Sequence, residues 1–496
     1  MKDISIENGI MAIDMEKPSL NANLIKKYHQ DLVYNYAEYP TCDHWSYNFT
    51  SEDYKNSLVK WLKKNKEEPI FFYVHTPFCE ELCYFCTCSK IITKNYETVK
   101  DYLYTYLFKE IELLFNILNE NEIRLNVKTV YFGGGSPTIY TKEDLKNLVD
   151  KLKGLFDFSN VGYFTIEIDP RRVDADRLLY NHKSCGANRL SFGLQDFDPI
   201  VQRRVNRIQP QEIFKEILTK EVREAYKTIA FDLLIGLPGQ TQETIAKTCD
   251  QIVELRPTII QLSLMAYKPW VAKYQIKMLE EGPLPDFFER KVLLDVINQK
   301  LVKAGYLRVG FECYALPDET MTQAYREGTA HYGASGHQTG GRVNFVAVGS
   351  SAKGNLGNEY YSQSFYDLRS YKECLDNGVF PTFRGMKLSK DDKIRQYATQ
   401  QLRSYFRLDF KQFERNFRII PKEYFSNEIE FLDEMINDGL VTLSNDGIEM
   451  TELGRDFSQY ITNVFDIYDP PTKSYNARLA TIKRAKLTEA NAGTNS

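Results

Sequence analysis

The alternation of short apolar strands with amphipathic helices across the middle of the chain most constrains its fold. The helical stretches Val99–Leu118 and Lys142–Phe156 carry apolar residues three and four positions apart, as on one face of a helix. Such alternation predicts an α/β fold with a parallel sheet covered by helices. Six strand-helix units fit a partial (β/α)6 barrel better than a complete eightfold one. The expected strands are Ile70–His75, Val127–Phe132, Tyr163–Ile168, Asn188–Gly193, Ile229–Ile235 and Thr258–Leu264.

The two ends of the chain lack this alternation and predict separate segments. Residues 1–65 form an N-terminal extension, and residues 66–370 form the alternating domain. Residues 371–466 are expected to be mostly helical, with the run Val441–Thr451 forming two short strands about an Asn-Asp-Gly turn. A helix followed by such a hairpin suggests a winged-helix-like module. The basic tail 467–496 is expected to be disordered.

Charge and hydropathy argue against two classes of partner. The 496 residues include 63 Lys and Arg against 67 Asp and Glu, a net charge of −4, which argues against a nucleic-acid-binding surface. No uninterrupted apolar run reaches the roughly 18 residues that a membrane helix needs. The first residues, MKDISIENGIMAIDMEKPS, lack the basic and apolar regions of a secretion signal. We therefore expect a cytoplasmic protein that binds neither nucleic acid nor membrane.

Nine cysteines are unevenly placed, and four of them fall within ten residues. Cys79, Cys83, Cys86 and Cys88 lie on a loop that follows the first expected strand. An odd total without even spacing does not resemble a secreted disulfide scaffold. Three thiolates separated by three and then two residues can converge on three corners of an iron-sulfur cubane and leave one iron open. A zinc site, a thioredoxin-like dithiol at Cys83 and Cys86, and plain core cysteines remain alternatives.

The longer string around the cysteines resembles a known family. The pattern C-x3-C-x2-C after a strand is the signature of radical S-adenosylmethionine enzymes. The string YVHTPFCEELCYFCTCSK, which begins at Tyr73, resembles the oxygen-independent coproporphyrinogen III oxidase family. The resemblance continues through GGGSPT, IEIDPR, RLSFGLQDF, DLLIGLPGQT and FRLDF and covers roughly residues 20–465.

This resemblance implies a fold and a metal centre. The fold is a partial (β/α)6 radical S-adenosylmethionine barrel at 66–370, with the extension 1–65 covering the substrate. The metal centre is a [4Fe-4S] cluster held by Cys79, Cys83 and Cys86, whose fourth iron is chelated by S-adenosylmethionine. The role of Cys88, which completes a C-x-C with Cys86, stays open.

The polar residues of these motifs occupy equivalent positions, because each lies at or just after the end of an expected strand. In parallel α/β folds the chemistry gathers at the carboxyl ends of the strands, so Glu167, Gln195 and Asp232 are expected to share one site. Glu167 could accept hydrogen bonds from a ribose or an ammonium group, and Asp232 must find a partner within its apolar strand. Simpler readings remain: a capping or solvated carboxylate at Glu167, a solvated arginine at Arg207, and a plain turn at the glycines.

The resemblance assigns these residues to cofactors and implies two bound molecules of S-adenosylmethionine. It also implies that Tyr73 and His75 are catalytic residues, whereas His75 judged alone could equally be a satisfied core histidine. Lys353 stands where the family usually has an apolar residue whose backbone touches the adenine. The cofactor-binding residues implied in this way are Tyr73, Phe85, Gly134, Gly135, Ser136, Glu167, Gln195, Arg207, Asp232, Ala266 and Lys353.

The implied chemistry is that of a 5′-deoxyadenosyl radical, formed when the reduced cluster donates an electron to bound S-adenosylmethionine. In the family's namesake reaction, hydrogen abstraction beside a propionate carboxylate leads to loss of CO2 and a vinyl group, twice per coproporphyrinogen III. This is a step of haem synthesis on a small-molecule substrate. The electron donor implied is a protein such as flavodoxin or ferredoxin.

One departure from the family pattern keeps other functions open. Asn35 replaces the arginine of the family's GPRYTSYPT stretch, which suits a propionate through bidentate pairing, and Glu38 adds a negative charge. The missing arginine favours a related radical enzyme that transfers a methyl or methylene group to another substrate, whereas the retained Cys88 favours decarboxylation. A third hypothesis is a non-enzymatic iron-sulfur or haem-binding protein, against which the intact set Glu167, Gln195, Arg207 and Asp232 argues.

Overall fold

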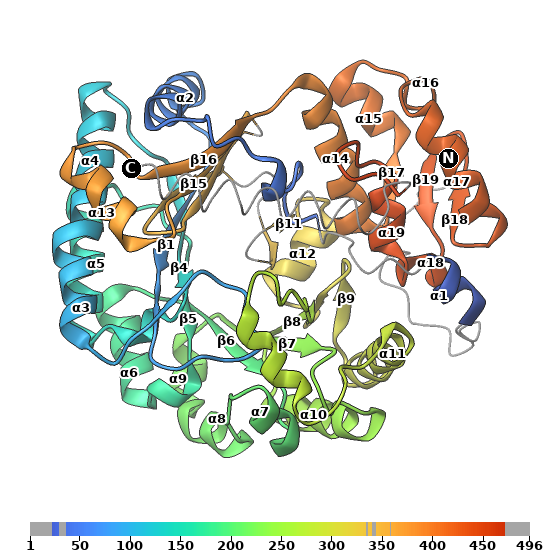
Figure 1. Ribbon diagram of the computed structural model, residues 1–496, viewed down its shortest axis with the longest axis horizontal. Helices are drawn as coiled ribbons and strands as arrows, with labels where there is room; N and C mark the ends of the chain where they lie inside the picture. Colours follow the sequence, from blue (N-terminus) through green and yellow to red (C-terminus); the bar gives the residue numbers. More distant parts are fainter. Residues whose placement is uncertain (1–21, 29–35, 334–335, 340–343, 358, 472–496) are drawn as a thin grey trace. The chain divides into compact units, whose positions relative to one another are not determined.

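The structure is a computed structural model that describes residues 22–28, 36–333, 336–339, 344–357 and 359–471 (Figure 1). The chain divides into two compact units, each built from separate stretches of sequence. The larger unit comprises residues 46–285 and 342–388, and the smaller one comprises 1–45, 286–341 and 389–496. No helix among the described residues is long and apolar enough to cross a membrane.

The six predicted strands are confirmed and lie side by side in the larger unit. Consecutive strands pair in parallel, so their carboxyl ends share one edge of the sheet. Their apolar side chains are buried on both faces, as Phe72 and Val74 of the first strand show, which is why they read as continuous apolar runs. The strands are β1 Ile70–Thr76, β4 Val127–Gly134, β5 Tyr163–Ile168, β6 Arg189–Gln195, β7 Thr228–Ile235 and β8 Ile259–Leu264.

Helices cover the outer side of this curved sheet (Figure 1). Helix α5, Lys142–Leu155, begins at the Thr141 cap and buries Leu145, Leu148 and Leu152 against the unit's core. The stretch predicted as one helix from Val99 to Leu118 is α3 Tyr96–Asp101, a π-helical turn Tyr102–Leu107 and α4 Phe108–Glu120. The remaining helices of this unit are α2 Ser51–Lys64, α6 Ala175–Tyr180, α7 Pro199–Arg204, α8 Gln211–Ile217, α9 Lys220–Ala225, α10 Gln242–Leu255 and α13 Leu368–Asp376.

The sheet of the larger unit extends beyond β1 on its other side. Strand β13, Asn344–Val348, pairs in parallel with β1, and Ile70 faces Asn344. Three antiparallel strands then follow in order: β14 Lys353–Leu356, β15 Tyr360–Ser364 and β16 Thr382–Lys387. Strand β16 lies in the segment predicted to be mostly helices with one hairpin, because its pairing with β15 is a long-range contact that local sequence does not reveal.

The smaller unit is mostly helical, as predicted for its C-terminal part. The expected hairpin is β18 Val441–Leu443 and β19 Gly447–Met450, and β19 also pairs with β17 Arg407–Asp409. The preceding helix α17 Ser426–Asn437 and this small sheet form the winged-helix-like module. The other elements are α1 Ala22–Tyr28, α11 Phe287–Lys303, β9 Leu307–Val309, β10 Cys313–Ala315, α12 Thr320–Arg326, β11 His331–Gly333, β12 Gly336–Gln338, α14 Lys390–Tyr405, α15 Phe410–Phe417, α16 Pro421–Tyr424, α18 Glu452–Arg455 and α19 Ser458–Asn463.

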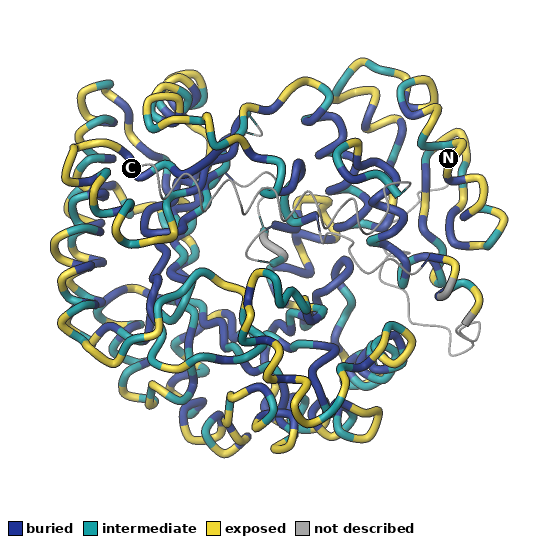
Figure 2. Tube along the Cα trace, in the orientation of Figure 1, coloured by how far each residue is buried: buried dark blue, intermediate teal, exposed yellow. Residues whose placement is uncertain are grey.

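Several sequence-based predictions concern the ends of this unit. Asn35 and residues 472–496 lie outside the described residues. Residues 467–471, at the start of the predicted disordered tail, are described, and Asp469 is buried with its carboxylate 2.7 Å from His44 Nε2. Figure 2 shows the buried interior of each unit in dark blue. The domain boundaries predicted at 65/66 and 370/371 rest on sequence composition, whereas the two units are defined by their compactness. These domain boundaries stay a prediction.

Candidate functional site

The cysteine loop leaves the carboxyl end of β1 and is closed at its base by a short parallel pair. The pair is β2 Phe78–Cys79 and β3 Ile91–Ile92, and the Ile91 amide donates to Pro77 O at 2.7 Å. Between them, the thiols of Cys79, Cys83 and Cys86 line one cavity of about 250 Å³. Spacing in the sequence therefore brings the three predicted ligands together.

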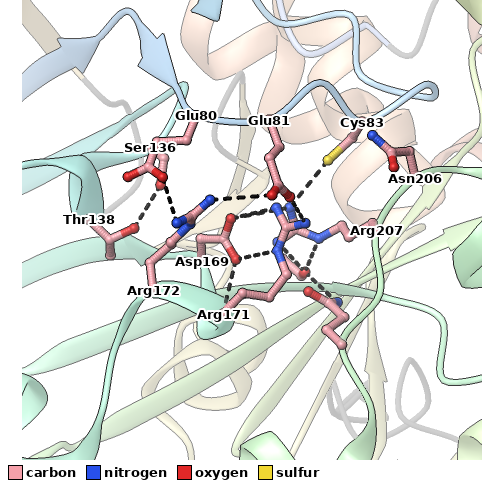
Figure 3. Close-up of polar contacts among 12 residues, drawn as sticks. Glu80, Glu81, Cys83, Ser136, Thr138, Asp169, Arg171, Arg172, Asn206 and Arg207 are labelled. Atoms are coloured by element: carbon pink, nitrogen blue, oxygen red, sulfur yellow. Dashed lines mark hydrogen bonds and ion pairs between the residues drawn. The ribbon is translucent and has the colours of Figure 1, made fainter. Parts of the chain in front are cut away.

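Two arginines from the turn after β5 hold the outer part of this loop. Arg171 Nη1 donates to Glu81 Oε2 at 2.9 Å, and Arg172 Nη1 lies 2.5 Å from Glu80 Oε2. Figure 3 shows both guanidinium groups pointing toward the loop that carries the two glutamates. Arg171 also donates two hydrogen bonds to the Asp169 carboxylate, from Nε to Oδ1 at 2.9 Å and from Nη2 to Oδ2 at 2.7 Å. The segment between Cys79 and Cys83 is thus fixed by ion pairs as well as by backbone bonds.

Arg207 approaches the cysteine loop from the segment after α7. Its guanidinium donates to Gly193 O at 3.1 and 2.8 Å, and Nη1 lies 3.6 Å from Cys83 Sγ and 3.8 Å from Asp169 Oδ2. Burial alone would raise the pKa of Asp169. The charge of Arg207 and the hydrogen bonds from Arg171 outweigh burial and lower that pKa to about 2. The Asp169 carboxylate therefore stays ionised and orients both arginines at the cavity.

On the opposite side, the segment after β8 holds the loop near its third cysteine. The Tyr274 hydroxyl donates to Cys86 O at 2.5 Å, and Lys90 Nζ donates to Cys86 O at 3.2 Å and to Tyr274 Oη at 2.8 Å. Gln275 Nε2 donates to both Phe85 O and Ala266 O at 3.0 Å. This amide places Ala266 beside the cysteine loop, although Ala266 is not among the residues that line the cavity.

The glycine run after β4 forms another wall and has no room for side chains. Gly134 has φ of +111°, and a Cβ there would lie 2.7 Å from the His75 ring. A Cβ on Gly133 would lie 2.7 Å from Glu167 Oε1. Because the glycines lack side chains, the Gly134 amide can donate to Glu167 Oε2 at 3.1 Å. The turn is therefore a specific close approach to a carboxylate and a histidine.

Two partly buried carboxyl groups, Glu167 and Asp232, lie on the wall of this cavity. Burial raises the pKa of Glu167 to about 7, although the Tyr131 hydroxyl donates to Oε1 at 2.9 Å. Burial also raises the pKa of Asp232 to about 6, and its hydrogen bond from Ser191 at 3.2 Å offsets this only in part. A cationic ligand near these two groups would favour their ionised forms.

Tyr73 and His75 form a pair beside the glycine turn, and neither is among the residues that line the cavity. The Tyr73 hydroxyl lies 3.0 Å from His75 Nδ1, and His75 Nε2 lies 3.3 Å from Ser89 O. Burial lowers the pKa of His75 to about 4, so the ring is neutral, donates from Nε2 and accepts from Tyr73. The pair supports Gly134 and the base of the cysteine loop.

Most of the predicted cofactor-binding residues line the same cavity. Gln195 reaches it at a bulge that ends β6, with φ of +69°. Lys353 lies in β14 and, like Tyr73, His75 and Ala266, is not among the lining residues. Cys88 does line the cavity, and the lining residues predicted from the sequence are Cys79, Cys83, Cys86, Phe85, Gly134, Gly135, Ser136, Glu167, Gln195, Arg207 and Asp232.

Sequence reasoning missed the charged residues that hold the loop. These residues line the cavity as well and include Glu80, Glu81, Asp169, Arg171 and Arg172. A usable signal was present, because Glu80-Glu81 follows β1 and Arg171-Arg172 follows β5. Both positions are at the carboxyl edge of one parallel sheet, where oppositely charged pairs can meet.

The residues present fit an iron-sulfur cluster. Among the described residues, no three His, Cys, Asp or Glu side chains are arranged to hold a single ion. A cubane does not require that convergence, because each thiolate binds a different iron. The cations Arg207 and Lys90 lie beside the cysteines and would balance the negative charge of thiolates. A hydrogen bond from the Cys88 thiol lowers the pKa of Cys86, which favours the thiolate that ligates metal.

Comparisons with known proteins agree with this donor set. The model of the radical SAM superfamily matches residues 73–252. A Pseudomonas aeruginosa protein named oxygen-independent coproporphyrinogen III oxidase is 34% identical over 453 residues, 91% of this chain and 96% of its own length. The Escherichia coli protein of the same name is 32% identical over 90% of this chain and 94% of its own.

A solved structure extends the similarity to three dimensions. It is the Escherichia coli coproporphyrinogen III oxidase, described as a radical SAM enzyme, and it is 31% identical to this chain. It superposes with a TM-score of 0.81 and covers 90% of this chain and 99% of the solved chain. The similarity therefore includes the barrel and the segments on either side of it.

Proposed function

Because the chain belongs to the oxygen-independent coproporphyrinogen III oxidase family of radical S-adenosylmethionine enzymes, we propose that it decarboxylates coproporphyrinogen III. The reaction converts two propionate groups into vinyl groups in haem biosynthesis. The observation that carries the proposal is the single cavity that joins three cysteine thiols with the predicted cofactor-binding residues. Family membership implies a [4Fe-4S] cluster and S-adenosylmethionine.

We assign the cluster to Cys79, Cys83 and Cys86. When bound, the cluster and S-adenosylmethionine supply the hydrogen-abstracting radical, and the protein supplies position and exclusion of water. The short base formed by β2 and β3 and the ion pairs of Glu80 and Glu81 fix the loop before the cluster is loaded. Cys88 faces the same cavity and is left out of the ligand set, because the family pattern needs three cysteines.

We propose that the two partly buried carboxyl groups, Glu167 and Asp232, bind the positively charged parts of two S-adenosylmethionine molecules. Glu167, held by Tyr131 and the Gly134 amide, is placed to accept hydrogen bonds from an ammonium or ribose group of the first molecule. Gln195, Arg207 and Asp232 form a neighbouring group and are assigned to the second. The raised pKa values of Glu167 and Asp232 support this, because a cation restores the ionised state that burial disfavours.

We assign supporting roles to the remaining predicted residues. Tyr73 and His75 keep the Gly134 turn in place, since a side chain at Gly134 would overlap the His75 ring. Gln275 donates to the carbonyls of both Ala266 and Phe85, so it holds Ala266 beside the part of the loop that lines the cavity. A backbone contact from Lys353 to an adenine stays a prediction. The free cysteines suit a reducing compartment, which supports a cytoplasmic location.

Anaerobic turnover tests the proposed function. The cluster is reconstituted without oxygen, reduced with dithionite, and incubated with S-adenosylmethionine and coproporphyrinogen III, and the products are analysed by mass spectrometry. Loss of two CO2 molecules per substrate is expected, with Cys83→Ala as the inactive control. A methylated product or S-adenosylhomocysteine without decarboxylation would favour the group-transfer alternative. No turnover by protein with a verified cluster would leave a non-enzymatic binding role.

A further inference from the structure

The segment Lys268–Leu279, called the lysine segment below, follows β8 and lies on the cysteine loop. Its inner face is fastened to that loop by two side chains, Tyr274 and Gln275. The Tyr274 hydroxyl donates to Cys86 O at 2.5 Å, and the fully buried Gln275 amide donates to Phe85 O at 3.0 Å. Anything that binds the outer face of the lysine segment is therefore separated from the Cys86 backbone by one layer of side chains.

The outer face combines unpaired lysines with exposed apolar side chains. The lysine segment contains three lysines and no Asp or Glu, in a chain whose net charge is −4. The exposed Glu280 and Glu281 follow it, and Glu281 already pairs with Arg204 at 3.3 Å. Lys273 and Lys277 are exposed, and neither forms an ion pair with any described carboxylate. Lys277 Nζ lies 5.1 Å from the ring centre of Tyr84 in the cysteine loop. Val271, Ile276 and Leu279 are 42%, 54% and 40% exposed.

The opposite rim of the cysteine loop has different electrostatics. Glu80 and Glu81 keep 34% and 43% of their side chains exposed there, and their carboxylates already pair with Arg172 and Arg171. An acidic protein would be repelled by these two carboxylates, and the arginines on that rim are already paired with them. The lysine segment is therefore the rim on which a negatively charged partner would seat.

We propose that the lysine segment is the docking surface for an acidic one-electron carrier protein. The proposal rests on the proposed function, which requires one electron to pass from a reduced carrier to the cluster held by Cys79, Cys83 and Cys86. The carrier is oxidised by one electron and the cluster is reduced by one. Small interfaces steered by charge, with a few apolar contacts at their centre, are typical of transient electron-transfer partners. Lys273 and Lys277 supply the steering, and Ile276 lies between them in the sequence.

Charge reversal at this face tests the proposal. The double variant Lys273→Glu/Lys277→Glu is compared with Lys60→Glu/Lys64→Glu on α2, a matched exposed pair with the same spacing of four residues. The probe is a flavodoxin reduced to its hydroquinone, mixed with cluster-loaded protein in a stopped-flow instrument. The second-order rate of cluster reduction should fall about tenfold or more at low ionic strength. The difference from the unmodified protein should shrink as added salt screens the charges. The α2 variant should match the unmodified protein.

Two further measurements keep docking separate from chemistry. Dithionite, which needs no docking surface, should reduce the cluster of the lysine-segment variant at the unmodified rate. Binding of oxidised flavodoxin, followed by calorimetry, should weaken by a similar factor without any turnover. Equal flavodoxin rates in both double variants would overturn the proposal, and so would a loss shared with dithionite. Self-association of the unmodified protein that the variant abolishes would make this face a dimer contact instead. A failure of the proposed function would appear as absent decarboxylation under dithionite, with flavodoxin binding unaffected.

Discussion

Replacing Arg171 with methionine should loosen the cysteine loop and speed the loss of iron. Arg171 makes two contacts with Asp169, whose side chain is 12% exposed, and one with the more exposed Glu81. Methionine keeps much of the apolar stem and removes all three contacts. Asp169 would then keep the backbone amide of residue 171, at 3.1 Å, and the Arg207 guanidinium, at 3.8 Å. Glu81 would keep only the 3.5 Å contact with Arg172.

The magnitude follows from how exposed each pair is. Hydrogen bonds to charged groups that are largely buried contribute about 1.5–3 kcal/mol, as for Arg171 with Asp169. Exposed ion pairs contribute about 0.2–1 kcal/mol, as for Arg172 with Glu80. Since about 1.4 kcal/mol is a tenfold change, Arg171→Met should speed iron release about ten- to a hundredfold. The neighbouring Arg172→Met should speed it only about two- to fivefold and serves as the matched control.

The assay is the rate at which reconstituted protein loses its visible cluster absorbance to an iron chelator, without oxygen. The Arg172→Met effect should shrink at high salt, because its ion pair with Glu80 is more exposed, while the Arg171→Met effect should persist. Equal rates for both variants and the unmodified protein would refute the reasoning that these arginines hold the loop.

Three further predictions concern the metal ligands, the glycine turn and a buried carboxyl group. Cys83→Ala should abolish the visible absorbance of the reconstituted cluster, and an unchanged spectrum would remove Cys83 from the ligand set. Gly134→Ala, at φ of +111° and with a Cβ 2.7 Å from the His75 ring, should lower the unfolding free energy by about 1–3 kcal/mol in denaturant titrations, which an unchanged midpoint would contradict. Glu110, a buried residue of α4, has a pKa that burial raises from 4.5 to about 7. The stability that its protonated form contributes is complete below pH 4.5 and is lost as pH rises through 7. Glu110→Gln should therefore remove about 3 kcal/mol of the stability difference between pH 4.5 and pH 8, and equal pH profiles would disprove that assignment.

The barrel could be predicted because parallel strands that are buried on both faces have continuous apolar sequences, which turn residues separate. Strand β5 begins and ends where the sequence placed it, at Tyr163 and Ile168. Strand β13 could not be predicted in the same way, because its place beside β1 pairs Asn344 with Ile70 across a large sequence separation. The discontinuous smaller unit escaped prediction for the same reason.

The candidate site was predictable where spacing or strand ends carry the information. The three cysteines and Asp232 reach the cavity as expected, and the family resemblance is confirmed by the relatives and the solved structure. His75 is not among the lining residues, and alternation along β1 does not reveal that its ring packs against Gly134. Its catalytic role stays a prediction. The ion pairs of Arg171 with Asp169 and Glu81 depend on side-chain rotamers, which no motif encodes.

Transfer of hydrogen from substrate to cofactor distinguishes radical decarboxylation from the alternative functions. Coproporphyrinogen III deuterated along its propionate side chains is incubated with the reduced, cluster-loaded protein and S-adenosylmethionine without oxygen. Decarboxylation by hydrogen abstraction should place deuterium in the 5′-deoxyadenosine that is formed, together with a product that has lost two CO2 molecules. Unlabelled 5′-deoxyadenosine, with all four carboxyl groups retained on the substrate, would contradict it.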